Sequence, residues 1–592
     1  MVKTLLKHVK EYKAASILTP IFMVFEVIME MVIPLMMSSI IDNGIDKGNL
    51  RHVYILGGVM VVFAVLGLLS GLGGGVFAAK ASTGFAKNLR KAMYDKIQTF
   101  SFANIDKFST AGLVTRLTTD VTNIQNSYQM ILRMAMRAPA TLIIALVLSF
   151  TKSVRIASIY LIAVILLGTV LVFIIRLTMR YFNQVFKKYD ALNESVQENV
   201  SAIRVVKAYV REGYETNKFQ TASNNIYKMF VKAESLIATN GPLMMFTVYV
   251  CILLISWMGA HMIVSNTLSK GELVALLSYC MNILMSLMML SMIFVMITLS
   301  LASGERIAEV LNEEPDIVNP KDPIMEVKDG SIEFKNVYFR YNQTSQEPVL
   351  KNINLKINAG ETVGIIGGTG SAKTSLVNLI SRLYDVVPEK GVEVSNDGFV
   401  SVGGLDVRKY DLKVLRDEVS VVLQKNVLFS GTIFENLRWG NKNATDEECI
   451  NACKLACADD FIENFPDKYN TRIEQGGNNV SGGQKQRICI ARALLKKPKI
   501  LILDDSTSAV DTATDAKIRK AFRDEIPNTT KIIIAQRVSS VMEADKIIVM
   551  DDGEINGIGT HDELVKNNDI YREVYESQTK GDADFDEVGG DC

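Results

Sequence analysis

Two adjacent acids, Asp504 and Asp505, close a short apolar run in the stretch LILDDSTSAVD, which begins at Leu501. The run is aliphatic and follows KPKI, a pattern typical of a buried parallel strand. Carboxylates at the carboxyl end of such a strand lie where α/β sheets bind their ligands. The two acids are therefore candidates for holding a metal ion or for activating a water molecule.

A glycine-rich loop upstream supplies the other half of such a site. The strand ETVGIIG leads into GGTGSAKTSLVNLI, whose spacing is nearly that of a phosphate-binding P-loop. There, backbone N–H groups and a helix N-terminus cradle phosphates, the lysine reaches the outer ones, and the threonine hydroxyl holds Mg²⁺. The predicted nucleotide contacts are Gly367, Gly368, Thr369, Gly370, Ser371, Ala372, Lys373, Thr374 and Ser375.

These motifs assign different tasks to the two acids. Asp504, beside the loop, is expected to hold Mg²⁺ through water, while Asp505 stands where a water-activating base would be. Ala372 departs from the P-loop pattern, which has glycine before the lysine. Because a methyl group leaves the backbone donors in place, we expect nucleotide binding to survive this change.

The elements that must position this site form only part of the chain. Its 592 residues are too many for one core, and 48% hydrophobic residues beside 22% charged ones indicate a membrane part joined to a soluble part. The net charge is zero, so no nucleic-acid partner is indicated. Seven cysteines without paired spacing favour a reducing compartment.

Six apolar stretches before residue 300 are long enough to cross a bilayer as helices. Basic residues cluster before the first stretch and in the long connections at 80–116 and 180–232, which predicts that both termini are cytoplasmic. Helical periodicity in these connections predicts that the membrane helices extend beyond the bilayer. The predicted spans are Ser16–Ile40, Val53–Ala79, Tyr128–Phe150, Ile156–Leu177, Pro242–Val264 and Leu273–Leu299.

Polar and soft side chains in these spans mark a candidate substrate cavity. Glu26 and Glu30 lie one turn apart, an expensive arrangement in lipid. They contact a substrate or proton, or they pair with the helix that carries Arg133 and Arg137. The last span carries many methionines, which line a promiscuous pocket or make ordinary helix contacts. The cavity residues proposed from sequence are Glu26, Glu30, Met285, Met289 and Met292.

The character of the sequence changes near residue 311. NEEPDIVNPKDP is rich in proline and acids, as linkers are, and strands, glycine loops and helices then alternate. We predict a multi-pass α-helical membrane domain followed by an α/β P-loop nucleotide-binding domain. The expected boundaries are 1–310 for the membrane domain, 311–325 for the linker, 326–577 for the nucleotide-binding domain and 578–592 for a disordered acidic tail.

A further motif indicates the family. VSGGQKQRICIARALLKKPKILILDD places SGGQ, a basic helix and the acidic strand in fixed succession. This resembles the ATP-binding cassette (ABC) superfamily, and six spans followed by one cassette resemble a half-transporter of the ABC exporter class. The resemblance implies ATP and Mg²⁺ as cofactors, and two regions, NIDKFSTAGLVTRLTTDV and IRVVKAYVREGYE, that dock onto cassettes.

The resemblance also implies roles for single residues. Tyr341 matches the aromatic residue that stacks on adenine, and Gln424 the glutamine that contacts Mg²⁺ together with Thr374 and Asp504. Asp511 matches the aspartate that communicates across the cassette dimer. The signature that caps a nucleotide on the partner cassette corresponds to Val480, Ser481, Gly482, Gly483 and Gln484.

Three positions depart from the family pattern at one bound nucleotide. Asp505 replaces the usual catalytic glutamate and is one methylene shorter, and a displacement of about 1 Å can cost on the order of 10²-fold in rate. Gln536, in KIIIAQRVSS, replaces a histidine and cannot carry its proton or charge. Together with Ala372, these changes predict a degenerate site that binds ATP and hydrolyses it slowly.

The chain is therefore expected to be one subunit of a heterodimeric ABC exporter. A second half-transporter with a consensus catalytic site would hydrolyse ATP, and the membrane helices would alternate between inward and outward openings. Two alternatives stay open: a homodimeric ATPase pump with Asp505 as base, and a non-transporting, ATP-gated membrane regulator. The wet, acidic, methionine-lined cavity suggests small amphipathic or cationic drugs as substrates. The compact layout and the lack of a targeting peptide suggest a bacterial cell membrane.

Overall fold

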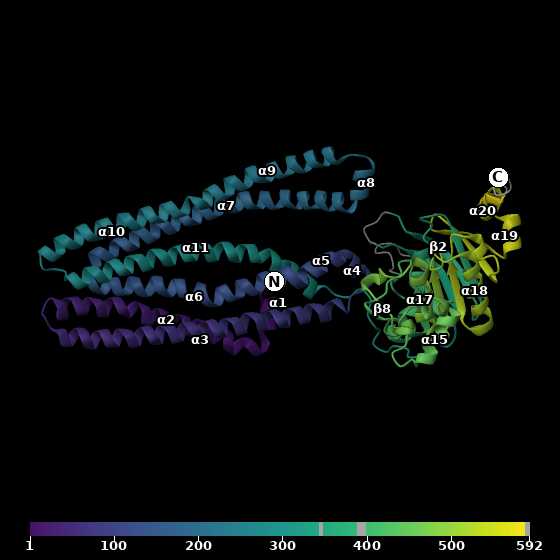
Figure 1. Cartoon of the computed structure of the whole chain (residues 1–592), viewed down its shortest axis with the longest axis horizontal. Helices are drawn as coiled ribbons and strands as arrows, with labels where there is room; N and C mark the ends of the chain where they lie inside the picture. The colour runs from purple at the N-terminus through teal and green to yellow at the C-terminus, as the bar shows by residue number, and fades with distance from the viewer. Residues whose placement is uncertain (342–346, 387–397, 587–592) are drawn as a thin grey trace. The chain divides into compact units, whose positions relative to one another are not determined.

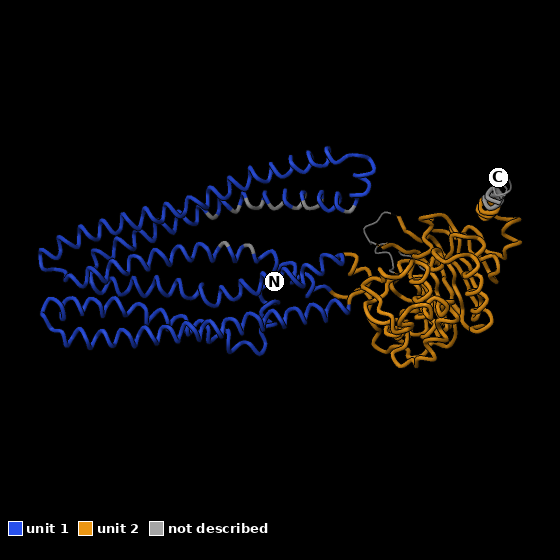
Figure 2. The backbone as a smooth tube through the Cα atoms, viewed as in Figure 1, with its two compact units in different colours: residues 1–99, 109–313 blue, residues 100–108, 314–592 orange. Residues whose placement is uncertain are grey.

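The computed structural model describes residues 1–341, 347–386 and 398–586. Contacts divide the chain into two compact units: residues 1–99 with 109–313, and residues 100–108 with 314–592 (Figure 2). The first unit is helical and the second is built on β-sheets. The predicted class, a helical membrane domain followed by an α/β domain, is confirmed.

Long helices make up most of the first unit (Figure 1). Hydrogen-bonding side chains fix several of their starts: Asn49 caps α3, Ser153 caps α7, and Ser269 forms a capping box with Glu272 at α11. The helices are α1 (Val2–Leu6), α2 (Lys13–Ser39), α3 (Leu50–Ile97), α5 (Thr110–Thr115), α6 (Val121–Lys152), α7 (Val154–Ser201), α8 (Ile203–Ala208), α9 (Glu212–Ala238), α10 (Asn240–Val264) and α11 (Lys270–Asn312).

The six predicted membrane helices are confirmed by length and composition. Within the described part of the chain, 6 helical segments are long and apolar enough to cross a membrane. Several are far longer than a bilayer needs: α3 and α7 have 48 residues each. The segments are Val2–Ile45, Leu50–Ile97, Thr110–Lys152, Val154–Thr178, Glu212–Val264 and Lys270–Asn312.

Buried tyrosines tie the membrane helices together. The hydroxyl of Tyr279 on α11 donates to the carbonyl of Met31 on α2 at 2.9 Å, and that of Tyr160 on α7 donates to the carbonyl of Leu276 at 2.8 Å. Both rings lie in an apolar cluster contributed by α2, α6, α7, α10 and α11. Farther along, α7 and α9 run side by side to α8 and diverge there from α6 and α11 (Figure 1).

Two sheets organise the second unit. The smaller sheet is antiparallel, in the order β2-β1-β4-β5, and the larger has the order β12-β11-β3-β10-β9-β6, parallel except for β12. The smaller sheet contains β1 (Ile332–Phe339), β2 (Leu350–Ile357), β4 (Phe399–Val402) and β5 (Leu405–Asp406). The larger contains β3 (Thr362–Gly367), β6 (Val419–Val422), β9 (Ile500–Asp504), β10 (Thr530–Ile534), β11 (Lys546–Asp551) and β12 (Glu554–Gly559).

Helices complete the second unit around these sheets. Strand β9 is buried along its whole length, and apolar clusters cover both faces of the large sheet. A short pair joins β7 (Gly431–Thr432) to β8 (Arg472–Ile473). The α-helices are α4 (Phe102–Phe108), α12 (Lys373–Ile380), α13 (Leu412–Glu418), α14 (Ile433–Leu437), α15 (Asp446–Leu455), α16 (Asp459–Glu463), α17 (Gly482–Leu494), α18 (Thr512–Glu525), α19 (His561–Asn567) and α20 (Asp569–Asp586).

Two segments of the chain differ from the domain boundaries predicted from the sequence. Residues 100–108, expected within the membrane domain, belong to the unit of the sheets, where Tyr384 donates to Asp106 at 2.7 Å and its ring meets Phe102 edge-on. Helix α20 continues past Ser577 to Asp586, where the sequence predicted a disordered tail from 578 onward. The remainder of that predicted tail, 587–592, lies outside the described residues.

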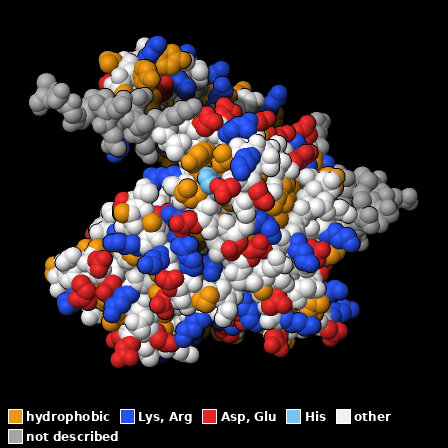
Figure 3. Space-filling model, turned by 90° about the vertical axis from the view of Figure 1, so that its right-hand side faces the viewer, with side chains coloured by type: hydrophobic (Ala, Val, Ile, Leu, Met, Phe, Trp, Pro, Cys, Tyr) orange, Lys and Arg blue, Asp and Glu red, His pale blue; other side chains and the backbone are white. Residues whose placement is uncertain are grey.

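The surface drawn in Figure 3 mixes charges of both signs. Lys and Arg side chains are interspersed with Asp and Glu, and hydrophobic side chains are scattered between them. This distribution agrees with the zero net charge of the sequence.

Candidate nucleotide site

The glycine-rich loop connects β3 to α12 in the second unit, as the sequence predicted. Lys373 opens α12, and its ammonium donates to the carbonyls of Gly367 at 2.9 Å and Gly368 at 2.7 Å, and to the Ser371 hydroxyl at 3.2 Å. Burial lowers the pKa of Lys373, an effect that the nearby carboxylates Asp504 and Asp505 oppose. The lysine therefore lies at the loop, beside both acids, where it can meet a phosphate.

Ala372 occupies a strained position in this loop. Its backbone has φ +69° and ψ +23°, in the left-handed region that glycine adopts at little cost. An L-residue with a Cβ pays roughly 1–2 kcal/mol for this conformation. The sequence predicted that nucleotide binding survives alanine at this position. The left-handed backbone shows why glycine would be less strained there.

Asp504 and Thr374 meet in the interior. The Thr374 hydroxyl donates to Asp504 Oδ1 at 3.0 Å, and Asp504 is only 2% exposed. Burial raises the pKa of Asp504; Asp505 adds to the rise, while Thr374 and Lys373 oppose it. A hydroxyl and a carboxylate side by side are the oxygen donors that Mg²⁺ prefers, so these residues fit the predicted metal.

Asp505 is held by amides. Its Oδ2 accepts from Gln536 Nε2 at 2.8 Å and from Gln424 Nε2 at 3.4 Å. Its backbone N–H donates to the Ile534 carbonyl at 3.1 Å, and its φ of +48° is unusual for a residue with a side chain. The structure thus brings together Asp505, Gln536 and Gln424, which lie on three separate strand ends.

Tyr341 lies beside the same loop. Its hydroxyl is 2.8 Å from that of Ser375 on α12, its ring packs edge-on against Phe339 and Tyr384, and it remains 46% exposed. An exposed aromatic face next to the phosphate loop is suited to stacking on a base.

The signature residues form the start of α17. Ser481 caps the helix: it accepts from the Gln484 N–H at 3.3 Å, and its own N–H donates to Gln484 Oε1 at 2.9 Å. A Cβ on Gly483 would lie 2.6 Å from the Ala509 carbonyl oxygen, so a close backbone approach requires glycine there. Val480 packs against the neighbouring apolar cluster.

Sequence reasoning missed Gln486, two residues beyond the signature. It is 6% exposed; its Oε1 accepts from the Ala509 N–H at 3.0 Å, and its Nε2 donates to the Ser508 hydroxyl at 3.3 Å. It therefore ties the signature helix to the turn after Asp505. Gln486 is a polar residue on the apolar face of the predicted helix, and this pattern could have indicated a buried hydrogen-bonding role.

Asp511 has a local role in the structure. It caps α18 by accepting from the Thr514 N–H at 2.9 Å, and this hydrogen bond lowers the pKa of its carboxyl.

In the first unit, Arg137 bridges the two membrane glutamates. Its Nη1 lies 2.7 Å from Glu26 Oε1 and its Nη2 lies 2.9 Å from Glu30 Oε2, which is the pairing weighed from sequence. Glu26 packs on Gly71, where an added Cβ would lie 3.2 Å from the carboxyl carbon. The second oxygen of Glu26, Oε2, is buried and has no hydrogen-bond partner among the described residues.

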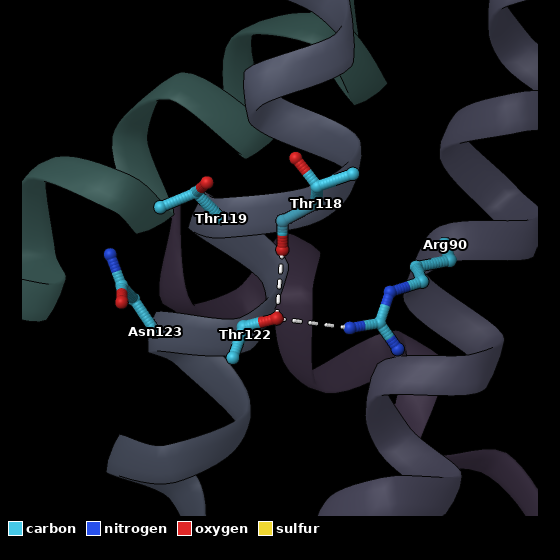
Figure 4. Close-up of a pocket in the computed structure, with 5 residues that line it drawn as sticks. All are labelled: Arg90, Thr118, Thr119, Thr122 and Asn123. Atoms are coloured by element: carbon cyan, nitrogen blue, oxygen red, sulfur yellow. Dashed lines mark hydrogen bonds between the residues drawn. The ribbon is translucent and has the colours of Figure 1, made fainter.

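The methionines predicted to line a substrate cavity differ in their exposure. Met285 and Met292 are each 61% exposed on α11, and Met289 is partly buried. A hollow of about 390 Å³ in the same unit is lined by residues with polar groups, and Arg90 donates there to the Thr122 hydroxyl at 3.2 Å (Figure 4). Its lining residues are Arg90, Thr118, Thr119, Thr122 and Asn123.

Comparison with known proteins agrees with both units. Residues 16–288 match the ABC transporter transmembrane region, and residues 350–508 match the ABC transporter family model for the cassette. The uncharacterized ABC transporter ATP-binding protein YfiB of Bacillus subtilis is 38% identical over 573 residues, covering 97% of this chain and 98% of that protein. An ATP-dependent lipid A-core flippase of Syntrophus aciditrophicus is 32% identical over 507 residues, covering 85% and 82%.

A membrane-spanning helical unit joined to one P-loop cassette defines an ATP-driven membrane transporter. The chain belongs to the ABC transporter family, and its single membrane region and single cassette fit a half-transporter.

Proposed function

We propose that this chain is one half of a heterodimeric ABC exporter whose own nucleotide site retains ATP and hydrolyses it slowly. A partner half-transporter supplies a consensus catalytic site, and the signature of this chain completes that site. The observation that carries the proposal is the contact of Asp505 with the amide of Gln536, where family members have a glutamate and a histidine.

The binding half of the site supports ATP retention. Lys373, Thr374 and Asp504 lie together at the phosphate loop, and Tyr341 offers an exposed ring beside it. Bound Mg²⁺ would neutralise phosphate charge at Thr374, Asp504 and Gln424. The backbone donors from Gly367 to Ser375 would cradle the phosphates.

The catalytic half of the site supports slow hydrolysis. A base must take a proton from the attacking water, and the Oδ2 oxygen of Asp505 is already engaged by Gln536 and Gln424. Neither amide titrates, so neither can exchange a proton as an imidazole can. The shorter side chain of Asp505 also places its carboxylate farther from the position that a glutamate would reach.

Exposed apolar side chains support a partner subunit. The region of α8, predicted to dock onto a cassette, exposes Val205 by 56%, Tyr209 by 75% and Val210 by 80%. Large apolar side chains exposed close together in the chain are suited to contact with a protein surface. The intact signature, Val480–Gln484, and Asp511 would act on the partner's nucleotide.

The substrate is proposed to be a small amphipathic molecule that moves outward by alternating access. Glu26 and Glu30 with Arg137, and the thioethers of Met285, Met289 and Met292, would offer polar and soft apolar contacts. The chain is a multi-pass membrane protein, and the proposed orientation in the cell membrane places both termini in the cytoplasm.

ATP turnover by the purified chain, alone and co-purified with its partner, tests this function. The chain alone is expected to show little turnover, and the pair to be active. The double change Asp505→Glu with Gln536→His, made while the partner's own base is removed, should raise turnover on the order of 10²-fold. Vigorous turnover by the unmodified chain alone would establish a homodimeric pump instead, and no turnover in any combination would favour a regulator.

A further inference from the structure

One side chain of the C-terminal helix brackets the loop that carries Gln536. Gln578 on α20 accepts from the Val538 N–H through Oε1 at 2.8 Å and donates through Nε2 to the Gln536 carbonyl at 2.9 Å. A carboxamide can do both at once because it carries a donor and an acceptor on one planar group. The two contacts fix the backbone on either side of Arg537.

The loop that carries Gln536 is anchored at both ends. On its far side Val538 is buried, and the Ser540 hydroxyl donates to Asp515 Oδ2 at 2.9 Å. The Ala535 N–H donates to the Ile365 carbonyl at 3.2 Å, which continues the sheet as far as the residue before Gln536. Between Ala535 and Ser540, Gln578 adds contacts to the backbone at Gln536 and Val538. The Gln536 side chain then reaches Asp505 Oδ2 at 2.8 Å. A continuous series of hydrogen bonds thus leads from α20 to the position of the catalytic base.

Helix α20 is held so that Gln578 faces this loop. Tyr571, Val574, Tyr575 and Gln578 follow at i, i+3, i+4 and i+7, so they share one face of the helix. Tyr571 is fully buried and its hydroxyl lies 2.8 Å from His561 Nδ1, while Val574 and Tyr575 pack against the apolar cluster that contains Val538. The apolar contacts position the helix, and the Gln578 amide hydrogen-bonds to the backbone of the loop.

We propose that Gln578 is a positioning residue: it holds Gln536 against Asp505, so that the C-terminal helix sets how long this nucleotide site retains ATP. The inference rests on the proposed function for the role of Gln536 at the nucleotide. Loss of Gln578 would loosen the backbone between Gln536 and Val538 and let the Gln536 side chain leave Asp505 and a bound phosphate. Since one hydrogen bond to a charged group is worth about tenfold in affinity, ATP release should be faster by about that factor.

The test uses the full chain with its co-purified partner, whose own P-loop lysine is replaced so that it holds no nucleotide. Radiolabelled ATP with Mg²⁺ is bound and chased with unlabelled ATP, and the release rate is measured for Gln578→Ala, Gln536→Ala and the double variant. Glu573→Gln is the matched control because Glu573 is exposed on the same helix and makes no polar contact among the described residues. Each single alanine change is expected to speed release about tenfold, and the double variant no more than either one.

Hydrogen exchange of the peptide around Val538 separates this idea from a loss of folding. Gln578→Ala should speed exchange there and leave strand β9 protected. Equal release from Gln578→Ala and Glu573→Gln, or additive effects of Gln578→Ala and Gln536→Ala, would overturn the proposal. An unchanged hydrogen-exchange rate around Val538 in Gln578→Ala would also overturn the proposal, whatever the result for ATP release.

The degenerate-site function can fail separately. If the unmodified site hydrolyses ATP rapidly, the holding function is wrong, while non-additive effects at Gln578 and Gln536 on ATP release would still establish the positioning role. If hydrolysis is slow and the effects of Gln578→Ala and Gln536→Ala on ATP release are additive, the positioning role of Gln578 is wrong and the proposed function stands.

Discussion

Each unit of this protein contains a pair of neighbouring carboxylates, and the two pairs have different hydrogen-bond and ion-pair partners. In the membrane unit, the guanidinium of Arg137 contacts Glu26 at 2.7 Å and Glu30 at 2.9 Å. In the cassette, the hydrogen bonds to the side chains of Asp504 and Asp505 come from the neutral groups of Thr374, Gln536 and Gln424. The two membrane carboxylates share one guanidinium, whereas Asp504 and Asp505 accept hydrogen bonds from neutral groups and have the ammonium of Lys373 nearby.

This difference separates a structural cluster from a ligand site. A buried carboxylate costs free energy unless a positive charge compensates it. Arg137 supplies most of that compensation permanently in a region where lipid solvates charge poorly. At Asp504, burial raises the pKa of the carboxyl even though Lys373 opposes the rise, so a mobile cation can supply further compensation. The cassette pair is prepared for a ligand in a way that the membrane pair is not.

The largest effect is expected at the metal position. Asp504→Asn removes the charge that would hold Mg²⁺, so ATP affinity measured with Mg²⁺ should fall on the order of 10²-fold, about 3 kcal/mol. Chelation of Mg²⁺ by EDTA should weaken binding to the unmodified chain and have little further effect on the variant. An equal response of both proteins to EDTA would contradict the role of Asp504.

Removal of the membrane cation comes next. Arg137→Leu leaves Glu26 and Glu30 uncompensated and should destabilise the protein by about 2–3 kcal/mol, less than for a fully buried pair because Glu30 is 43% exposed. Thermal unfolding in lipid nanodiscs measures the loss. Arg137→Lys is the control: it keeps the charge, cannot bind both carboxylates through one planar group, and should lose less. An unchanged unfolding temperature in Arg137→Leu would mean that water or another cation already compensates the pair.

The two membrane glutamates should differ from one another. Glu26 is 18% exposed and has the shorter contact to Arg137, so Glu26→Gln should cost about 1 kcal/mol. Glu30→Gln leaves a neutral Glu26–Arg137 pair and should change stability by less than about 0.5 kcal/mol. The same unfolding measurement compares them, and an equal or reversed order would show that Glu30 carries the pair.

The smallest effect concerns the phosphate loop itself. Ala372→Gly relieves the left-handed backbone at φ +69° and should stabilise the cassette by about 0.5–1 kcal/mol. Thermal unfolding measures this gain, and ATP affinity should rise slightly or stay the same. A matched control is Ala509→Gly, at a position where no left-handed backbone favours glycine. Destabilisation by Ala372→Gly would mean that the methyl group makes contacts worth more than the strain.

Much of this molecule could be predicted from single segments of sequence. The apolar spans gave six membrane helices because hydrophobic length is a local property. The P-loop spacing predicted the strand, loop and helix around Lys373, since glycine and lysine positions act through local backbone geometry. Other features could not be predicted in this way. The assignment of residues 100–108 to the cassette unit depends on contacts such as Tyr384 with Asp106, far apart in the chain.

The sequence by itself determined the family, the membrane spans and the residues that depart from the family at one nucleotide. These are statements about residue types at fixed spacing. Only the tertiary structure decided which groups hold those residues: Arg137 between Glu26 and Glu30, and Gln578 behind Gln536. The physical reason is that a hydrogen bond or an ion pair acts over about 3 Å, and folding alone brings such distant segments within that range.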